Sequence, residues 1–402
     1  MISVKEAKSL ILDHISPLPV QQVTLAIAAG ATLGADVYAQ YDIPAFVQSS
    51  MDGYAFRFAD RNQPLIVHGE MQAGTSVQST LLPQYASRVF TGAPIPNGAD
   101  TVVMQEKVEI LNDKIIIQDL NLSLGDNVRD KGAEVTTGAL AMARGSKLTP
   151  AAIGFLAGIG VTDVKVHQIP TVGVIATGKE LQQPGNPLSF GQVYESNSFS
   201  LAAALEQAQI SKINFYAADD NLEELTAVLK DALKDNDVVL LTGGVSVGDY
   251  DFVIRAADRA GVSQIFHKVK QKPGKPLYFG KTDAQLVFGL PGNPSSVLSC
   301  FYHYVLPALE KLSNYKTGIT DNDQPSGRLK SKEALLMASC TKPAGITHFL
   351  KAWYNDGNVT PLHAQESFRM SSFAAANCMI ELGEEQTSAV AGTMVKVHIF
   401  PE

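Results

Sequence analysis

The chain has 402 residues, of which 45% are hydrophobic and 18% charged, a composition typical of a folded globular protein and too apolar for a disordered one. At about 150 residues per domain, this length predicts two to four domains. Acidic residues number 40 and basic residues 32, and the resulting net charge of −8 argues against a nonspecific nucleic-acid binder or a protein that binds anionic membranes.

The three cysteines are widely spaced and form no CxxC pair, so the sequence predicts neither a disulfide framework nor a thiolate zinc site. The first residues, MISVKEAK, lack the apolar core of a signal peptide, and no apolar run reaches 18 residues. We therefore expect a cytoplasmic protein that neither crosses nor binds a membrane.

The first 170 residues predict helices around a small β region. Ser3 and Glu6 form a capping box that opens a helix, and an Ala-rich stretch from Thr24 to Ala39 predicts a second one. Between 42 and 129, short β-branched runs alternate with Gly, Pro and Asn turns, which indicates a small β domain. Thr149 and Pro150 then cap a third helix.

From residue 170 onward, apolar strands alternate with helices. Strands are predicted at 171–177, 213–218 and 237–244, a further apolar run at 286–294 leads into the last helix, and helices are predicted at 196–208, 221–235, 252–261 and 294–312. Fully apolar strands separated by helices are typical of a doubly wound, mostly parallel sheet with helices on both faces. A polar stretch after residue 314 leads to a C-terminal small β domain, so the fold class is multidomain α/β.

Three of these strands run into glycine-bearing turns, in VIATGKEL, VLLTGGVSVGDYD and VFGLPGNPSS. Ligands bind at the carboxyl ends of parallel strands, where glycines allow close approach and helix N-termini present free N–H groups to anions. Each turn alone is also compatible with a plain strand–helix connection. Together they favour a site for a phosphate-bearing ligand.

A lysine-rich turn reverses the sign of the charge locally. FHKVKQKPGKPLYFG carries Lys268, Lys270, Lys272 and Lys275 without a carboxylate, and its prolines exclude a helix. Two interpretations stay open: an edge strand protected by lysines, or a cradle for phosphate or another oxyanion.

Carboxylates gather near other predicted strand ends. Asp219, Asp220 and Asp251 follow strands and Glu195 precedes a helix, positions that suit Mg²⁺ held through oxygen atoms and water. Helix capping would explain each of these residues considered singly. Two further loops, SSMDGYA with Asp52 and GDNVRDKGAEV with Glu134, have no evident folding role beyond that of turns.

Taken together, the motifs resemble the molybdopterin molybdenumtransferase family, whose organisation also occurs in the C-terminal part of gephyrin. The matching segments follow the family's order along almost the whole chain: DIPAFVQSSMDGYA, FTGAPIPNGADTVVMQE, GDNVRDKGAEV, VIATGKEL, VYESNS, LLTGGVSVGDYDFV, KQKPGKP and GLPGNPSS. Two departures are Lys179, where the family usually has Asp or Asn, and Asp130 within an often more basic run.

The resemblance implies four domains in an elongated homodimer with its active site between subunits. We place a discontinuous helical linker domain at 1–45 and 132–168, an inserted β domain at 46–131, the α/β molybdopterin-binding domain at 169–313 and the C-terminal β domain at 314–402. The implied substrates are adenylylated molybdopterin and molybdate, the products molybdenum cofactor and AMP, and the implied cofactor a divalent cation such as Mg²⁺. Contact with the molybdopterin adenylyltransferase is also expected.

The resemblance assigns a role to each candidate site residue. Catalytic roles fall to Asp52, supplied by the partner subunit, and to Glu134, Glu195 and Asp251; the metal would be held by Asp219, Asp220 and Asp251. The substrate-binding set consists of Gly243, Gly244, Ser246, Lys268, Lys272, Lys275, Pro291, Asn293 and Ser371. Two other functions stay open: the preceding adenylyltransferase activity, which needs only the α/β domain, and a non-catalytic scaffold like gephyrin.

Overall fold

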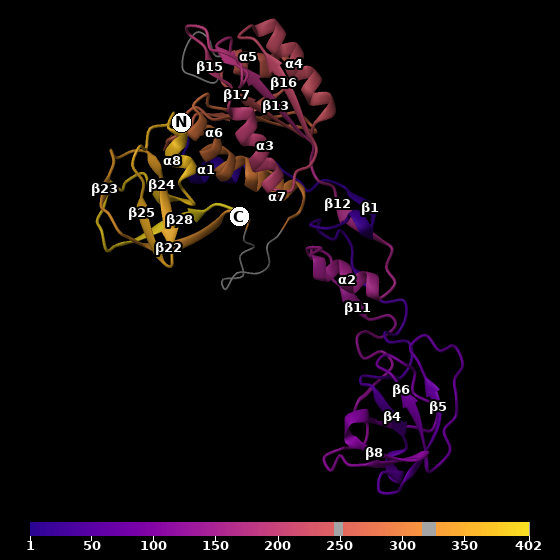
Figure 1. Ribbon diagram of the computed structural model, residues 1–402. Helices are drawn as coiled ribbons and strands as arrows, with labels where there is room; N and C mark the ends of the chain where they lie inside the picture. Colours follow the sequence, from indigo (N-terminus) through magenta and orange to yellow (C-terminus); the bar gives the residue numbers. More distant parts are fainter. Residues whose placement is uncertain (245–251, 316–326, 402) are drawn as a thin grey trace.

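The computed structural model describes residues 1–244, 252–315 and 327–401. Figure 1 shows an extended molecule, with the α/β and C-terminal β domains at one end and the inserted β domain at the other. None of the described helices has the length and apolarity that crossing a membrane requires.

The α/β domain is built on a six-stranded sheet of order β16-β13-β17-β21-β20-β18. Its first four strands run parallel, and the last two are antiparallel to their neighbours. The strands are β13 (Val172–Thr177), β16 (Ile213–Ala218), β17 (Val238–Thr242), β18 (Ser263–His267), β20 (Tyr278–Lys281) and β21 (Leu286–Leu290).

Helices cover both faces of this sheet. They are α3 (Asn197–Gln207), α4 (Leu222–Asp235), α5 (Phe252–Arg259), α6 (Pro294–Cys300) and α7 (Leu306–Leu312), with a π-helical segment at Phe301–Val305 joining the last two. One core contains Val174 with Leu201 of α3, and the other contains Ile175 with Leu229 of α4. Alternation of side chains along β13 thus supplies both cores, as period-2 geometry requires.

The N-terminal segment is divided between two cores. Helix α1 (Val4–Asp13) begins at Ser3, whose hydroxyl accepts a hydrogen bond from the Glu6 N–H, and packs into the α/β core. The linker region contains the strand pairs β1 (Val20–Thr24) with β12 (Asp163–His167) and β2 (Val37–Tyr38) with β11 (Leu140–Met142), and helix α2 (Pro150–Gly158).

The predicted helix from Thr24 to Ala39 is wrong. Only a single 3-10 turn forms, at Leu25–Ile27. Gly30 then adopts a φ of +80°, and Leu33 pairs as an isolated bridge with Val166. Ala28, Ala31 and Ala39 are buried in this linker core, whereas Ala26 and Ala29 are exposed, so the alanines form no helical stripe. Helix propensity was overridden by glycine conformation and by pairing with distant strands.

Two β domains complete the chain. The inserted domain has strand order β7-β4-β6-β5-β9-β8, and the C-terminal sheet has order β19-β24-β25-β22-β28-β26 and closes through a β24–β26 pairing. The first set is β4 (Gly53–Phe56), β5 (Leu65–Met71), β6 (Tyr85–Val89), β7 (Thr101–Met104), β8 (Val108–Leu111) and β9 (Lys114–Ile117). The second is β19 (Gln271–Lys272), β22 (Lys330–Leu336), β24 (Thr347–Asn355), β25 (Asn358–Pro361), β26 (Cys378–Leu382) and β28 (Met394–Ile399). Short helix α8 (Met370–Ala374) lies between β25 and β26.

Candidate functional site

A cavity of about 930 Å³ lies at the carboxyl ends of the parallel strands. Its walls come from the turns after β13, β17 and β21, from the lysine-rich turn and from the C-terminal domain. Seven of the predicted site residues line it: Asp220, Gly243, Gly244, Lys272, Lys275, Pro291 and Asn293. The three glycine-bearing turns therefore converge on one site, as the sequence predicts.

The turn after β17 needs glycine. Gly243 has a φ of +88°, and a Cβ there would lie 2.8 Å from the carbonyl oxygen of Thr177. The Thr177 hydroxyl, at the end of β13, donates a hydrogen bond of 3.0 Å to the carbonyl of Thr242, at the end of β17. The backbone of this turn consequently comes directly to the cavity wall, where no side chain separates it from a ligand.

The lysine-rich turn is supported from the protein core. Gln271 Nε2 donates to the Gly274 carbonyl at 2.9 Å, and the buried Tyr304 hydroxyl donates to Gln271 Oε1. Gly274 has a φ of +85°, and a Cβ there would lie 2.5 Å from Cys300 Sγ. These contacts fix the turn that presents the exposed side chains of Lys272 and Lys275 to the cavity.

Both interpretations of the lysine-rich turn apply at Lys272. It lies on β19, the edge strand of the C-terminal sheet, and also lines the cavity.

Burial raises the pKa of the nearby Cys300 thiol to about 12, so this cysteine supports packing and supplies no thiolate.

Among the described residues, two carboxylates line the cavity, those of Asp220 and Glu180. Within the ranges that the structure describes, no group of three His, Cys, Asp or Glu side chains is arranged to hold a metal ion. Mg²⁺ in proteins is commonly bound by one or two carboxylates plus substrate phosphates and water. The two acids fit a cation that arrives with a phosphate-bearing substrate.

The C-terminal domain completes the cavity through Gln365, Ser367 and Phe368, which the sequence prediction missed. Asn293 Nδ2 donates to Ser367 Oγ at 2.9 Å, and the Ser295 N–H donates to the Ser367 carbonyl at 3.1 Å. Ser371, the residue predicted here, is exposed on α8 outside the cavity lining. The SSF motif pointed to the correct segment but to a position four residues beyond Ser367.

Three other predicted residues lie beside the cavity but not in its lining. Glu195 is buried, and its carboxylate accepts hydrogen bonds from the backbone N–H and the hydroxyl of Ser198 in the first turn of α3. Asp219 is exposed next to Asp220. Lys268 has a φ of +72° and donates its N–H to the Leu277 carbonyl. Ser246 and Asp251 lie outside the described residues, and Lys179 is exposed away from the cavity lining.

Asp52 and Glu134 do not meet the cavity within one chain. Figure 1 places β4, which begins at Gly53, at the far end of the molecule from β13 and β17. The Asp52 carboxylate accepts hydrogen bonds of 2.8 Å from the N–H and the hydroxyl of Thr91, and these bonds lower its pKa. Glu134 is exposed in the loop that follows Asp130 and pairs its N–H with the Ile43 carbonyl.

Family models match the chain in three consecutive blocks. Residues 2–160 match the MoeA N-terminal region (domains I and II), 173–311 a probable molybdopterin-binding domain, and 333–400 the MoeA C-terminal region (domain IV).

Relatives match along the full length. The molybdopterin molybdenumtransferase of Haemophilus influenzae is 33% identical over 409 residues, covering 100% of this chain and 99% of the relative. The enzyme of the same name from Nostoc sp. is 37% identical over 332 residues, covering 79% of this chain and 76% of the relative. A molybdopterin biosynthesis MoeA protein from Pyrococcus horikoshii superposes with a TM-score of 0.83 at 28% identity, covering 100% of both chains. The chain has the domains of these proteins in the same order, and its glycine-bearing turns meet at one cavity. It belongs to the molybdopterin molybdenumtransferase (MoeA) family.

Proposed function

We propose that this protein is a transferase that inserts molybdenum from molybdate into adenylylated molybdopterin, forming molybdenum cofactor and releasing AMP. The observation that carries the proposal is the cavity where Lys272, Lys275 and the Gly243–Gly244 turn face Asp220 and Glu180. It combines donors for phosphate and molybdate oxygens with acids for a cation. Family membership supports a molybdopterin as the phosphate-bearing substrate.

Phosphate and oxyanion groups are bound by the two lysines and by backbone N–H groups of the glycine turn. Pro291 and Asn293 shape the wall beside the N-terminus of α6. Ser246 and Ser371 belong to the proposed substrate-binding set as neighbours of these groups. Lys268 belongs to it as a basic residue of the same segment that lies outside the cavity lining and acts on the substrate only through its charge at longer range. Because the pterin dithiolene supplies sulfur to molybdenum, the protein itself needs no thiolate cluster.

Asp220 and Glu180, with Asp219 and Asp251, would hold a divalent cation such as Mg²⁺. A cation bound there supplies charge neutralisation to the phosphoanhydride that links pterin phosphate to AMP. The chain's own contribution is positioning and electrostatic stabilisation, which together account for most catalysis of phosphoryl chemistry.

The proposed active form is a cytoplasmic homodimer whose site is completed by the partner. Asp52 lies too far along the molecule to reach the cavity of its own chain, which favours delivery from a second copy. Asp52 and Glu134 would then organise the attacking water, together with Glu195 next to α3. Contact with the adenylyltransferase would transfer the adenylylated substrate directly.

AMP release tests the proposal. Purified protein incubated with adenylylated molybdopterin, molybdate and Mg²⁺ should release AMP only when molybdate is present. If it instead forms adenylylated molybdopterin from molybdopterin and ATP, the protein performs the preceding step. If it binds the pterin but never releases AMP, the catalytic proposal fails in favour of a scaffold.

A further inference from the structure

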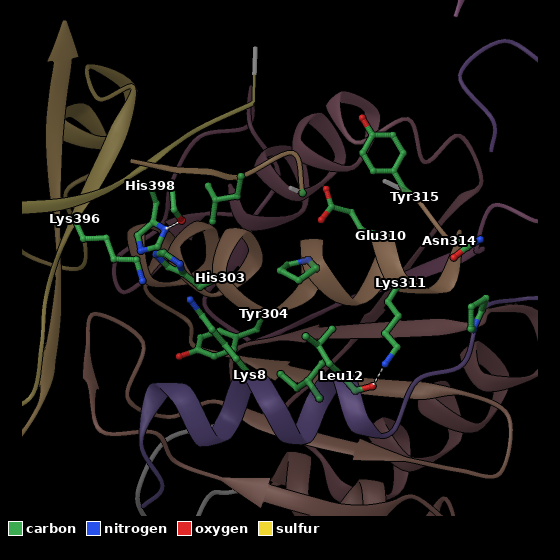
Figure 2. Close-up of a pocket in the computed structure, with 16 residues that line it drawn as sticks. Lys8, Leu12, His303, Tyr304, Glu310, Lys311, Asn314, Tyr315, Lys396 and His398 are labelled. Carbon is green, nitrogen blue, oxygen red and sulfur yellow. Dashed lines mark hydrogen bonds between the residues drawn. The ribbon is translucent and has the colours of Figure 1, made fainter. Parts of the chain in front are cut away.

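A second cavity, of about 570 Å³, lies between helix α1, the helix through residues 301–312 and strands β22 and β28 of the C-terminal domain (Figure 2). It shares no lining residue with the proposed active-site cavity. The proposed reaction uses none of its side chains, so their arrangement needs a separate explanation.

One end of this cavity is basic. Figure 2 shows the amino groups of Lys8 and Lys396 and the ring of His303 directed toward the same space, with His398 beside them. The nearby carboxylate of Glu381 is already bound, by Lys396 Nζ at 3.2 Å and by His398 Nε2 at 2.6 Å. At this end, Lys8, Lys396 and Glu381 together carry one excess positive charge. The other charged lining residues among those described, Lys311 and Glu310, carry opposite charges, so the excess remains available for a ligand.

His303 is the clearest sign that a ligand belongs here. The residue is 1% exposed, and among the described residues neither of its ring nitrogens has a hydrogen-bond partner. Its ring stacks on Phe349 with centroids 3.9 Å apart, which holds the imidazole in place without satisfying its polar edge. Buried polar atoms are normally paired, so two unpaired nitrogens at a cavity wall point to a missing partner.

Lys8, which is half-buried, has no hydrogen-bond or ion-pair partner within the part of the chain that the structure describes. Burial lowers the pKa of its amino group to about 8, and the charge of Lys396 adds to the shift while Glu381 opposes it. Its Nζ lies 5.9 Å from the centroid of the Phe349 ring. A negative charge beside Lys8 would offset the cost of keeping this buried ammonium charged.

The rest of the cavity is largely apolar. Apolar side chains line it, together with Lys311, whose amino group already donates to the Leu12 carbonyl; the apolar set is Ile11, Leu12, Pro17, Pro307 and Leu329. Glu310, the acid among the described lining residues, lies away from the basic end in Figure 2 and accepts a hydrogen bond from the Arg328 N–H. An occupant of this space therefore needs an anionic head and an apolar body.

We propose that this cavity is a binding site for a small organic monocarboxylate, with its carboxylate between Lys8, Lys396 and His303 and its apolar body against Ile11 and Pro307. The carboxylate matches the single unbalanced positive charge, and it can accept from the Lys8 ammonium and from one N–H of a neutral His303. The volume lies within the range of ordinary small-molecule sites.

Benzoate tests the site, with benzamide as its neutral isostere. Isothermal titration of the full-length protein should show benzoate binding about tenfold or more tighter than benzamide, because charge-assisted hydrogen bonds to the head are lost in the amide. The ¹⁵N resonances of the His303 ring should shift on benzoate addition. No detectable benzoate binding, or equal binding of both compounds, would overturn the proposal.

Variants place the binding in this cavity. Lys8→Met and His303→Phe should each weaken benzoate binding about tenfold or more, whereas Lys5→Met, an exposed lysine on the same helix, should leave it unchanged. Lys272→Met should also leave it unchanged, since that residue lines the other cavity. Binding that survives Lys8→Met but disappears in Lys272→Met would assign benzoate to the active-site cavity and refute the second site. Thermal melting of each variant confirms that the loss is not unfolding.

Discussion

Lys272 and Lys268 are four residues apart in one basic segment, yet of the two only Lys272 lines the proposed active-site cavity. We predict that Lys272→Met weakens the binding of adenylylated molybdopterin by about ten- to a hundredfold, equivalent to ~1.5–3 kcal/mol for a charge-assisted hydrogen bond. Lys268→Met should change the affinity less than about twofold, the range expected of a screened surface charge. Equilibrium binding at two ionic strengths measures both.

Equal losses in the two lysine variants would mean that net charge, and not the geometry of the turn, determines affinity. Lys275 offers an internal check because it lines the same cavity from the other side of Gly274. Its substitution by Met should resemble Lys272→Met.

His348 predicts a pH dependence of stability. It is buried with Nε2 unpaired among the described residues, and burial, with the nearby charges of Lys272 and Lys342, lowers its pKa to about 4. The unfolded chain binds this proton at about pH 6.5, so its contribution to stability is complete above pH 6.5 and is lost as the pH falls toward 4. His348→Phe should reduce the drop in the urea midpoint between pH 7 and pH 5.

The control for that pH dependence is His363→Asn, which alters an exposed histidine in the same domain. It should leave the drop in the urea midpoint as large as in the unmodified protein. An equal reduction in both variants would remove His348 as the cause.

Residues that line the cavity directly after a strand could be predicted from the sequence more readily than residues that reach the cavity through tertiary contacts. Gly243 and Asn293 follow predicted strands directly, so the topology alone places them at one edge. Ser367 reaches the cavity only because Asn293 and Ser295 bind it across a domain boundary. No local pattern encodes that contact.

At the scale of elements, the hydrogen bonds from Tyr304 to Gln271 and from Gln271 to Gly274, which support the lysine-rich turn, can be tested by substitution. Tyr304→Phe removes the donor to Gln271 Oε1 and leaves a buried acceptor, which should cost about 1–3 kcal/mol of unfolding free energy. Pterin affinity should fall as well, because Gln271 holds Gly274. Urea denaturation and binding titration give the two readouts.

Tyr302→Phe is the matched control for the turn, since the Tyr302 hydroxyl makes only a 3.5 Å contact, to Gln207. It should lose less stability and retain pterin affinity. If Tyr304→Phe unfolds more easily but binds pterin normally, the hydroxyl stabilises the core without positioning the turn.

Helix α4 depends on its cap. Asn221 Oδ1 accepts hydrogen bonds from the N–H groups of Glu223 and Glu224, at 3.0 and 3.1 Å. Asn221→Ala should destabilise the protein by about 1 kcal/mol, and Asn221→Asp, which retains the acceptor, by much less. Chemical denaturation compares them. A loss in Asn221→Asp equal to that in Asn221→Ala would show that the amide group, and not the cap, matters.

The elements predicted correctly from the sequence are those that are stabilised by contacts between near neighbours in the chain or that show a regular hydrophobic pattern. Ser3 and Thr149 cap their helices as expected, and the apolar strands β13, β17 and β21 lie side by side in the sheet. The helix predicted from Thr24 to Ala39 does not form, and three of its alanines, Ala28, Ala31 and Ala39, instead pack into a core built with distant strands. Composition alone does not distinguish a buried alanine from a helical one.

At the scale of the molecule, strands from distant segments share sheets. Strand β19, which carries Lys272, pairs with β24 in the C-terminal sheet although it lies between β18 and β20 of the α/β sheet in the chain. This pairing joins the two domains at the active-site cavity. A two-residue strand in a proline-rich turn gives too weak a pattern to be predicted.

The distance of Asp52 from the cavity of its own chain leads to a prediction about how two subunits share each active site. If each active site combines Asp52 of one subunit with Lys272 of the other, Asp52→Ala and Lys272→Met proteins should each lose most AMP release. Co-refolding equal amounts should restore about a quarter of the unmodified activity, because half of the randomly formed dimers contain one intact site of two. If both residues served the site of their own chain, every mixed dimer would contain two damaged sites and no activity would return. Co-refolding each variant with itself controls for recovery by refolding alone.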